Sequence, residues 1–228
     1  MRESEWAAVL DAAARLQQLV PDAVLVGGSA AALHAQHRVS YDDDVVEDLR
    51  SRFDGVLDAL EDSQGWVTAR LSRPVLILGS LDGVETGVRN LIRTRPLEVE
   101  SVDVPAGTLR VPTLAEITRI KAWLCLIRNA TRDYLDVVAL ADRLGLPVAA
   151  DVLLGLDDYY QDQRGTGGQR IGTQVAKQLA EPRPGDLSQV DLASYRQLAR
   201  RWREWTAVAD ASRMLSIAML ERLAEQPG

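Results

Sequence analysis

The sequence of 228 residues has little or none of several features, and each absence narrows the class of protein. Its one cysteine, Cys125, has no partner for a disulfide within the chain, which fits a reducing, cytoplasmic compartment. No stretch approaches the ~18 uninterrupted apolar residues of a membrane-spanning helix. The N-terminal sequence MRESEWAAVL lacks the basic and then apolar order of a signal peptide. We therefore expect a cytoplasmic globular protein without a membrane partner.

Basic residues are fewer than acidic ones, with 26 Lys and Arg against 33 Asp and Glu and a net charge of −7. An acidic protein repels phosphate at long range, which argues against indiscriminate binding of nucleic acid. The two signs are separated along the chain. Residues 1–64 hold thirteen acidic and five basic residues, whereas residues 89–132 hold eight basic and four acidic ones. Only Lys121 and Lys177 are lysines, so both positions merit attention.

Apolar periodicity and turn residues predict an α+β fold. Residues 1–112 are expected to form a mixed β-sheet with helices, and residues 113–228 a helical bundle. Ser29 is expected to cap a helix over 30–37, and Thr113 with Glu116 to form a capping box. Further helices are predicted over 6–19, 49–63, 114–129, 131–145, 148–163, 194–208 and 209–226. Strands are predicted over 23–26, 44–49, 66–71, 74–81, 83–88, 97–104 and 108–111.

The segment VLVGGSAAALHAQHRVSYDDDVV carries the strongest chemical signal. A buried strand runs into Gly28 and Ser29, whose backbone and hydroxyl groups suit a phosphate at a helix start. Asp42 and Asp44 lie two apart in an extended stretch, so both carboxylates share a face. Two such oxygen ligands suit Mg²⁺, which takes a few carboxylates together with substrate phosphates and water. A plain strand–helix turn and a solvated acidic turn are the alternatives.

A second constellation lies in the predicted helical half. Lys121, Cys125 and Arg128 fall on one face of a helix, and Asp133 and Asp136 share a face of the next helix. If these helices pair, the two basic residues can oppose the two aspartates. A lysine in an acidic cleft would bind triphosphate as a point charge, and Asp136 could orient it or assist proton transfer. Lys121 as an edge residue, and the aspartates as structural ion-pair partners, are the alternatives.

The Gly-Ser pair, the twelve residues that follow it and the Asp-x-Asp pair resemble the signature of the nucleotidyltransferase superfamily. Together with RIKAWLCLIRNATRDYLDVVAL, the pattern resembles the AbiEii-type toxins, including the MenT toxins of mycobacteria. The likeness covers about residues 22–145. By this resemblance Ser40 and Asp42 match the Ser/Thr-x-Asp motif, and Asp44 is the second metal carboxylate. The nucleotide-contacting lysine and the late catalytic aspartate correspond to Lys121 and Asp136, with Arg128 added to the nucleotide-binding set.

The resemblance implies a Mg²⁺-dependent enzyme of a toxin–antitoxin system. Such an enzyme would transfer a nucleoside monophosphate from an NTP to the 3′ end of tRNA and so block translation, with a cognate antitoxin as regulator. The helical half would complete the active site and bind the acceptor. The third carboxylate usual in such enzymes has only weak candidates in Glu85, Glu98 and Glu100.

Other readings stay open beside this one. The acceptor could instead be a protein or a small molecule, which the acidity of the chain favours. A degenerate domain that only binds its partner would explain a missing third carboxylate. His34 and His37, spaced i and i+3 without another nitrogen or sulfur ligand, do not indicate zinc. The arginines of residues 195–205 suit either an exposed helix face or an RNA backbone groove.

Overall fold

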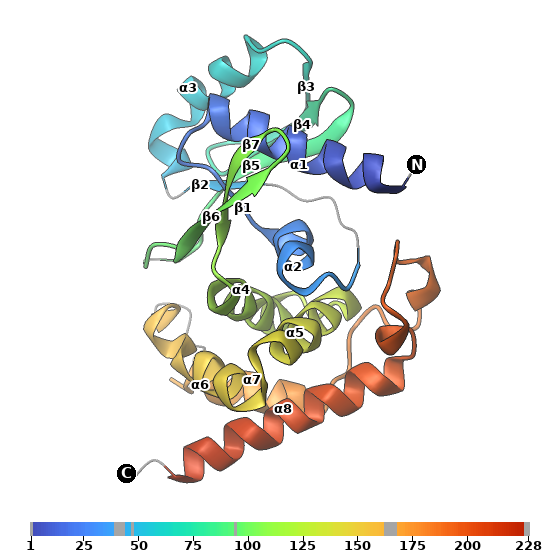
Figure 1. Cartoon of the computed structure of the whole chain (residues 1–228). Coiled ribbons are helices and arrows are strands. Elements are labelled where there is room, and N and C mark those ends of the chain that lie inside the picture. The colour runs from blue at the N-terminus through green and yellow to red at the C-terminus, as the bar shows by residue number, and fades with distance from the viewer. Residues whose placement is uncertain (1, 39–43, 47, 94, 162–167, 226–228) are drawn as a thin grey trace. The chain divides into compact units, whose positions relative to one another are not determined.

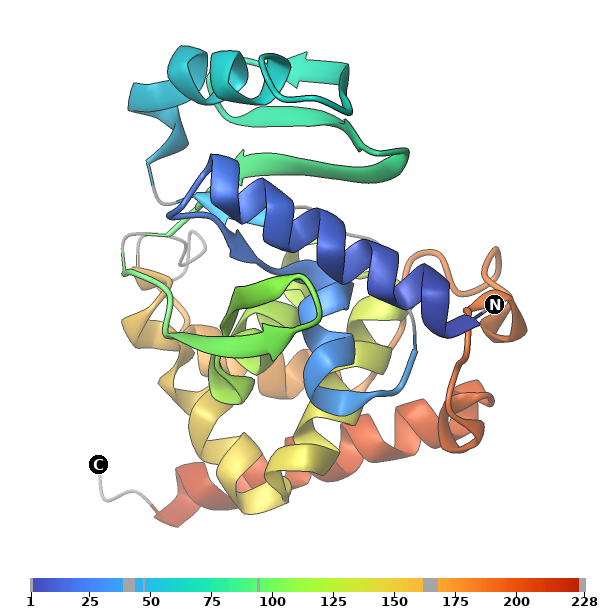
Figure 2. The same ribbon diagram turned by 45° about the horizontal axis from the view of Figure 1, so that its top comes forward.

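A computed structural model describes residues 2–38, 44–46, 48–93, 95–161 and 168–225 (Figures 1 and 2). The chain divides into two compact units, each built from several segments. The first comprises Met1–Ala30, Ser40–Ile92 and Pro96–Thr113. The second comprises Ala31–Val39, Arg93–Arg95 and Leu114–Gly228. Two short segments from the first 112 residues therefore belong to the helical unit.

The first unit contains a five-stranded sheet in the order β1-β2-β5-β4-β3. Strands β2 and β5 pair in parallel, and the other neighbours are antiparallel. A separate two-stranded antiparallel sheet is formed by β6 and β7. The elements are α1 (Arg2–Leu19), β1 (Val24–Leu25), the start of α2 (Gly27–Ala35), β2 (Asp44–Val46), α3 (Leu49–Glu61), β3 (Trp66–Ser72), β4 (Leu76–Leu81), β5 (Val84–Asn90), β6 (Val99–Val104) and β7 (Gly107–Pro112).

Side chains of α1, α3 and the larger sheet share one hydrophobic core. Ile77 of β4 and Val88 of β5 are register partners, and both are fully buried. Leu16 of α1 and Leu60 of α3 are equally buried in the same cluster. Burying each such side chain contributes about 1.5–3 kcal/mol. The two helices therefore cover the face of the sheet that carries Ile77 and Val88.

The second unit is a helical bundle around a second core. Its last helix, red in Figures 1 and 2, runs beside α5, α6 and α7. The core includes Tyr134 and Leu135 from α5, Leu153 from α6 and Leu215 from α8. The elements are α4 (Leu114–Ile127), α5 (Thr131–Leu144), α6 (Leu146–Leu154), η1 (Gly155–Asp158), α7 (Ile171–Ala180), η3 (Leu192–Ser194), η4 (Arg200–Trp202) and α8 (Trp205–Glu225).

The predicted α+β class is confirmed, and several local expectations are corrected. Helix α2 begins at Gly27, whose φ of +74° turns the chain out of β1, so Ser29 lies inside the helix and does not cap it. The helix expected over 148–163 is already 3₁₀ at Gly155. No α-helix covers 194–204, where Gln197 takes a φ of +54° between two 3₁₀ turns. Helix α7 was not anticipated.

Candidate functional site

Two of the predicted site residues, Ser40 and Asp42, lie outside the described residues. For Asp44 the structure gives the backbone, which opens strand β2. Asp44 is the register partner of Leu25, the last residue of β1, and Gly27 follows two residues later. Gly28 and Ser29 then form the first turn of α2. Strand pairing thus places the backbone of one predicted metal ligand beside the predicted phosphate-binding turn.

The chemistry of the predicted donor set fits Mg²⁺, because two carboxylates with substrate phosphates are its usual ligands in such sites. Among the side chains that the structure describes, no three from His, Cys, Asp and Glu gather closely enough to hold a metal ion. The predicted ligands are not among these side chains, since Asp42 lies outside the described residues and Asp44 is described by its backbone.

The candidates for a third carboxylate do not lie beside Asp44 in the sheet. The register partner of Asp44 on β5 is Val88. Glu85 lies three residues before Val88, so strand alternation turns it to the other face, and it is exposed. Glu100 belongs to β6 in the separate two-stranded sheet, and Glu98 comes just before that strand.

A buried charge cluster centred on Asp136 is the most developed polar site in the second unit. Its carboxylate is fully buried and accepts hydrogen bonds from Arg38 through Nε (2.7 Å to Oδ1) and Nη2 (2.9 Å to Oδ2). Lys121 Nζ lies 2.7 Å from Oδ2, and His37 Nε2 lies 2.7 Å from Oδ1. The side chains of these three partners are at most 5% exposed. We call this set the Asp136 cluster: His37, Arg38, Lys121 and Asp136.

Local structure explains how these groups meet. Lys121 projects from α4 and Asp136 from α5, and the two helices pack against each other. Helix α2 ends at Ala35, and Gln36 adopts a φ of +51°, which turns the chain away from the helix axis before His37 and Arg38. The carbonyl of His37 accepts a hydrogen bond of 2.8 Å from the N–H of Ala199, which fixes the backbone there.

The electrostatics of the cluster keep Asp136 ionised. Burial alone would raise the pKa of Asp136, but Arg38, Lys121 and the hydrogen bond from His37 hold it well below its usual value. A carboxylate in that state is a weak proton acceptor near neutral pH. It can orient a lysine and an arginine, which are the groups that bind phosphate oxygens.

The predicted pairing of the two helices is confirmed at a second point. Arg128 contacts Asp133 through Nε (2.8 Å) and Nη2 (2.5 Å), and Asp133 is fully buried. The Arg128 side chain is 39% exposed, so one edge of this pair reaches solvent. Cys125 lies on α4 between Lys121 and Arg128. Burial is the main cause that raises the pKa of its thiol well above the ordinary value, and the negative charge of Asp133 adds to the effect. Cys125 is therefore a core residue and not a nucleophile.

Sequence reasoning missed two members of the Asp136 cluster, His37 and Arg38. Both lie in HAQHR, the stretch that contains the two histidines of the chain. The only local signal was a basic pair just after a helix, which is too common to predict burial. His37 Nδ1 is also buried without a hydrogen-bond partner among the described residues. Glu116, assigned to a capping box, forms ion pairs with Arg93 (2.5 Å) and Arg119 (2.9 Å).

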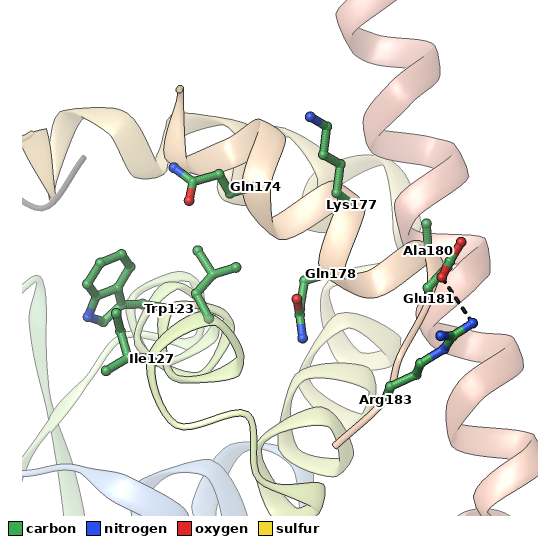
Figure 3. Close-up of a pocket in the computed structure, with 9 residues that line it drawn as sticks. Trp123, Ile127, Gln174, Lys177, Gln178, Ala180, Glu181 and Arg183 are labelled. Atoms are coloured by element: carbon green, nitrogen blue, oxygen red, sulfur yellow. Dashed lines mark ion pairs between the residues drawn. The ribbon is translucent and has the colours of Figure 1, made fainter. Parts of the chain in front are cut away.

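A pocket of about 850 Å³ lies elsewhere in the second unit, beside α4 and α7 (Figure 3). Lys177, the other lysine of the chain, belongs to its lining, whereas Lys121 and Asp136 do not. Gln178 donates hydrogen bonds to Asn129 Oδ1 (3.0 Å) and Tyr134 Oη (2.6 Å). The lining includes Trp123, Ile127, Gln174, Lys177, Gln178 and Arg183.

Comparison with solved structures identifies a nucleotidyltransferase-like fold. JHP933 from Helicobacter pylori superposes with a TM-score of 0.51 at 15% identity, over 96% of this chain and 94% of that one. A second H. pylori structure, described as a candidate nucleotidyltransferase, gives a TM-score of 0.51 at 15% identity, over 95% and 98% of the two chains. Identity this low establishes the shared fold alone.

Sequence comparison finds a different kind of relative, and no family model matches. The chain is 31% identical over 230 aligned positions to the haem uptake protein MmpL11 of Mycobacterium tuberculosis. That alignment covers 93% of this chain but 22% of the relative. The mycolic acid-containing lipids exporter MmpL11 of Mycolicibacterium smegmatis is 32% identical over 57% of this chain and 13% of that protein. The chain thus spans about a fifth, or less, of these relatives.

None of the helices in the described ranges combines the length and the apolarity needed to cross a bilayer.

Proposed function

We propose that the chain is a Mg²⁺-dependent nucleotidyltransferase that transfers a nucleoside monophosphate from an NTP to an acceptor hydroxyl. The observation that carries this proposal is the pairing of β1 with β2, which sets Asp44 beside the turn that leads into Gly28 and Ser29. The likeness to the H. pylori structures supports the same reading at the level of the fold.

In this proposal each residue has a separate task. Asp42 and Asp44 hold Mg²⁺, and Ser40 belongs to the same motif. Bound Mg²⁺ would neutralise the charge of the triphosphate and of the leaving pyrophosphate. Gly28 and Ser29 bind phosphate oxygens through backbone N–H groups and a hydroxyl.

In the helical half, Lys121 is the residue that we propose to contact the triphosphate. Arg128, which is exposed just after the same helix, belongs to the same nucleotide-binding set. Asp136 acts as a positioning residue, because it fixes Lys121 at 2.7 Å and Arg38 through two hydrogen bonds. The acceptor hydroxyl oxygen attacks the α-phosphorus and gives up its proton to solvent, the bond to the β-phosphate oxygen breaks, and pyrophosphate leaves.

The acceptor that we propose is the 3′ end of tRNA, with the chain acting as the toxin of a toxin–antitoxin system in the cytoplasm. This part depends on the resemblance to AbiEii-type and MenT-like toxins. Transfer of a nucleotide to the 3′ end would block aminoacylation, and a cognate antitoxin would restrain it.

Labelling of total tRNA with each of the four [α-³²P]NTPs and Mg²⁺ tests the proposal. We expect label transfer with at least one NTP, its loss in Asp42→Asn, and full activity in Asp58→Asn, which removes an exposed carboxylate from α3. A folded sample that transfers no label to RNA or to protein with any NTP would refute the enzymatic reading.

The position of Glu85 favours a second candidate, a nucleotidyltransferase-like domain that binds nucleotide without turnover. Here Mg²⁺ and NTP together raise the melting temperature, following RT ln(1 + [L]/Kd), while no label is transferred. A protein or small-molecule acceptor is a further alternative. Mass spectrometry of candidate acceptors incubated with the enzyme and ATP would detect the added nucleotide.

A further inference from the structure

Three arginine side chains of the helical unit converge on one tyrosine ring. The guanidinium carbons of Arg119, Arg95 and Arg93 lie 4.2, 4.4 and 5.0 Å from the centroid of Tyr159. Arg119 comes from α4, and the other two belong to the short segment 93–95 that the helical unit takes up. Three guanidinium groups around one ring concentrate positive charge at this point of the helical unit. We call Arg93, Arg95, Arg119 and Tyr159 the arginine cluster.

The members of the arginine cluster differ in what neutralises them. Glu116, which is fully buried, forms ion pairs with Arg93 and Arg119. Arg95 is exposed, and its guanidinium has no carboxylate partner among the residues described. The guanidinium lies over the Tyr159 ring, and its exposed side chain can still donate hydrogen bonds to a ligand. An arginine fixed in this way loses little freedom when it binds an anion.

The neighbouring rings are already occupied by protein groups. Trp123 stacks on Tyr160 with centroids 4.5 Å apart, and Arg93 lies 5.7 Å from the centroid of Tyr160. Both tyrosines are nearly buried. The cluster can therefore bind charge but has no open ring on which a base would stack. That combination suits contacts to the sugar-phosphate backbone, which do not depend on base identity.

Space for more than one phosphate group lies close by. Trp123, one helical turn after Arg119 on α4, also lines the 850 Å³ pocket that contains Lys177 (Figure 3). The pocket therefore brings a second cation, Lys177 of α7, to the part of α4 that carries Trp123. An extended polyanion uses both features, whereas an isolated phosphate uses one.

We propose that the arginine cluster is a binding site for a backbone phosphate of a nucleic-acid strand, with Arg95 as the residue that contacts the phosphate. The site gives the RNA acceptor of the proposed function a contact in the helical unit, and its role in holding an acceptor rests on that proposed function. Binding itself needs neither Mg²⁺ nor NTP. The net charge of −7 makes such a local site necessary, since the protein as a whole repels a polyanion.

Fluorescence anisotropy of the full chain with a labelled single-stranded RNA, without Mg²⁺ and NTP, tests the site over a series of salt concentrations. We expect Arg95→Ala to raise Kd roughly three- to tenfold and to reduce the slope of log K against log salt by about 0.7, the value for one phosphate contact to a single strand. The Kd of Arg95→Lys should lie between those of the wild type and Arg95→Ala, because lysine keeps the charge but not the planar guanidinium group. Arg143→Ala, which removes an exposed arginine from α5, should match the wild type.

The inference is overturned if Arg95→Ala leaves both Kd and the salt slope unchanged, if Arg143→Ala alters them equally, or if the wild type binds no RNA at low salt. It is also overturned if Arg95→Ala weakens ATP binding, measured by calorimetry, and spares RNA, since the site would then hold nucleotide phosphates.

Failure of the proposed function gives a different pattern. If RNA binding depends on Arg95 while no acceptor is labelled, the phosphate site stands and the enzymatic proposal fails. If labelling succeeds and Arg95→Ala changes neither RNA binding nor labelling, the enzymatic proposal stands and the phosphate site at Arg95 fails.

Discussion

Asp136 is the residue that holds together one group of buried charges in the helical unit. Three donors converge on its two oxygens, and none of their side chains is more than 5% exposed. A buried pair of this kind gives little net stability relative to apolar residues, yet removal of one partner leaves a buried charge uncompensated. The cluster therefore constrains the sequence strongly, whether or not it contacts a substrate.

Replacement of Asp136 by Asn should lower the free energy of unfolding by about 3–5 kcal/mol, because Arg38 and Lys121 lose their shared counter-charge. Urea denaturation followed by circular dichroism measures the change. The matched control is Asp142→Asn, whose partner Arg201 and own side chain are both about half exposed, so the loss should stay below about 1 kcal/mol. Equal losses in the two variants would contradict the structural role of the cluster.

The lowered pKa of Asp136 should make the free energy of unfolding depend on pH. The pKa of Asp136 is well below its usual value in the folded chain and about 3.9 when unfolded, so the unfolded state takes up the proton first as pH falls. Its stabilisation is present above about pH 4 and is lost as pH falls through the folded pKa. The difference in unfolding free energy between wild type and Asp136→Asn should therefore narrow from pH 6 to pH 3. A constant difference would show that folding leaves the pKa of Asp136 unshifted.

At the scale of elements, helix α7 shows what local patterns do not reveal. Asp157, 14 residues before its first helical residue, accepts hydrogen bonds from the N–H groups of Ile171 (3.0 Å) and Gly172 (3.4 Å). Helix α5 is capped from an even greater distance, since Asp186 accepts from the N–H of Thr131 (2.7 Å). A cap that is remote in sequence gives no signal at the helix start, so α5 was predicted from its apolar spacing and α7 was not predicted.

Asp157→Ala should lower the free energy of unfolding by about 1–2 kcal/mol and speed hydrogen exchange at the first amides of α7. The neighbouring Asp158 is exposed, so Asp158→Ala is a matched control with an effect below about 0.5 kcal/mol. Thermal melts and exchange mass spectrometry give the two readouts. Unaltered exchange at residues 171–173 in Asp157→Ala would contradict the capping role.

Sequence reasoning succeeded where contacts are local and failed where they are not. Helical spacing predicted that Lys121 would meet Asp136 and that Arg128 would meet Asp133, because the four residues lie on consecutive helices. Arg38, 98 residues before Asp136, could not be predicted, since no spacing rule connects segments so far apart.

The helix predicted over 194–208 was wrong at residues 194–204 for a related reason. Its apolar residues have helical spacing, but Leu198 and Trp202 are buried in the bundle core while Gln197 takes a positive φ. Tertiary packing overrode local propensity there.

At the scale of the whole molecule, the helical unit is assembled from three parts of the chain. A cut at the predicted boundary between 112 and 113 separates His37 and Arg38 from Asp136, and Arg93 from Glu116. In a fragment of residues 113–228, Asp136 keeps Lys121 and Glu116 keeps Arg119. Each of these two fully buried carboxylates loses its contact with an arginine from the missing part of the chain. Such losses cost several kcal/mol each, against a typical domain stability of 5–15 kcal/mol.

We therefore expect the fragment 113–228 to lack a cooperative thermal transition, whereas the full chain shows one. Circular dichroism melts and near-ultraviolet spectra of the two samples measure the difference. Adding a synthetic peptide of residues 31–39 should restore part of the structure, because it returns Arg38 and His37 to Asp136, and a peptide with Arg38→Ala serves as its control. A fragment that melts cooperatively at the temperature of the full chain would show that the bundle folds without these segments, and the boundary predicted from the sequence would then describe an independent domain.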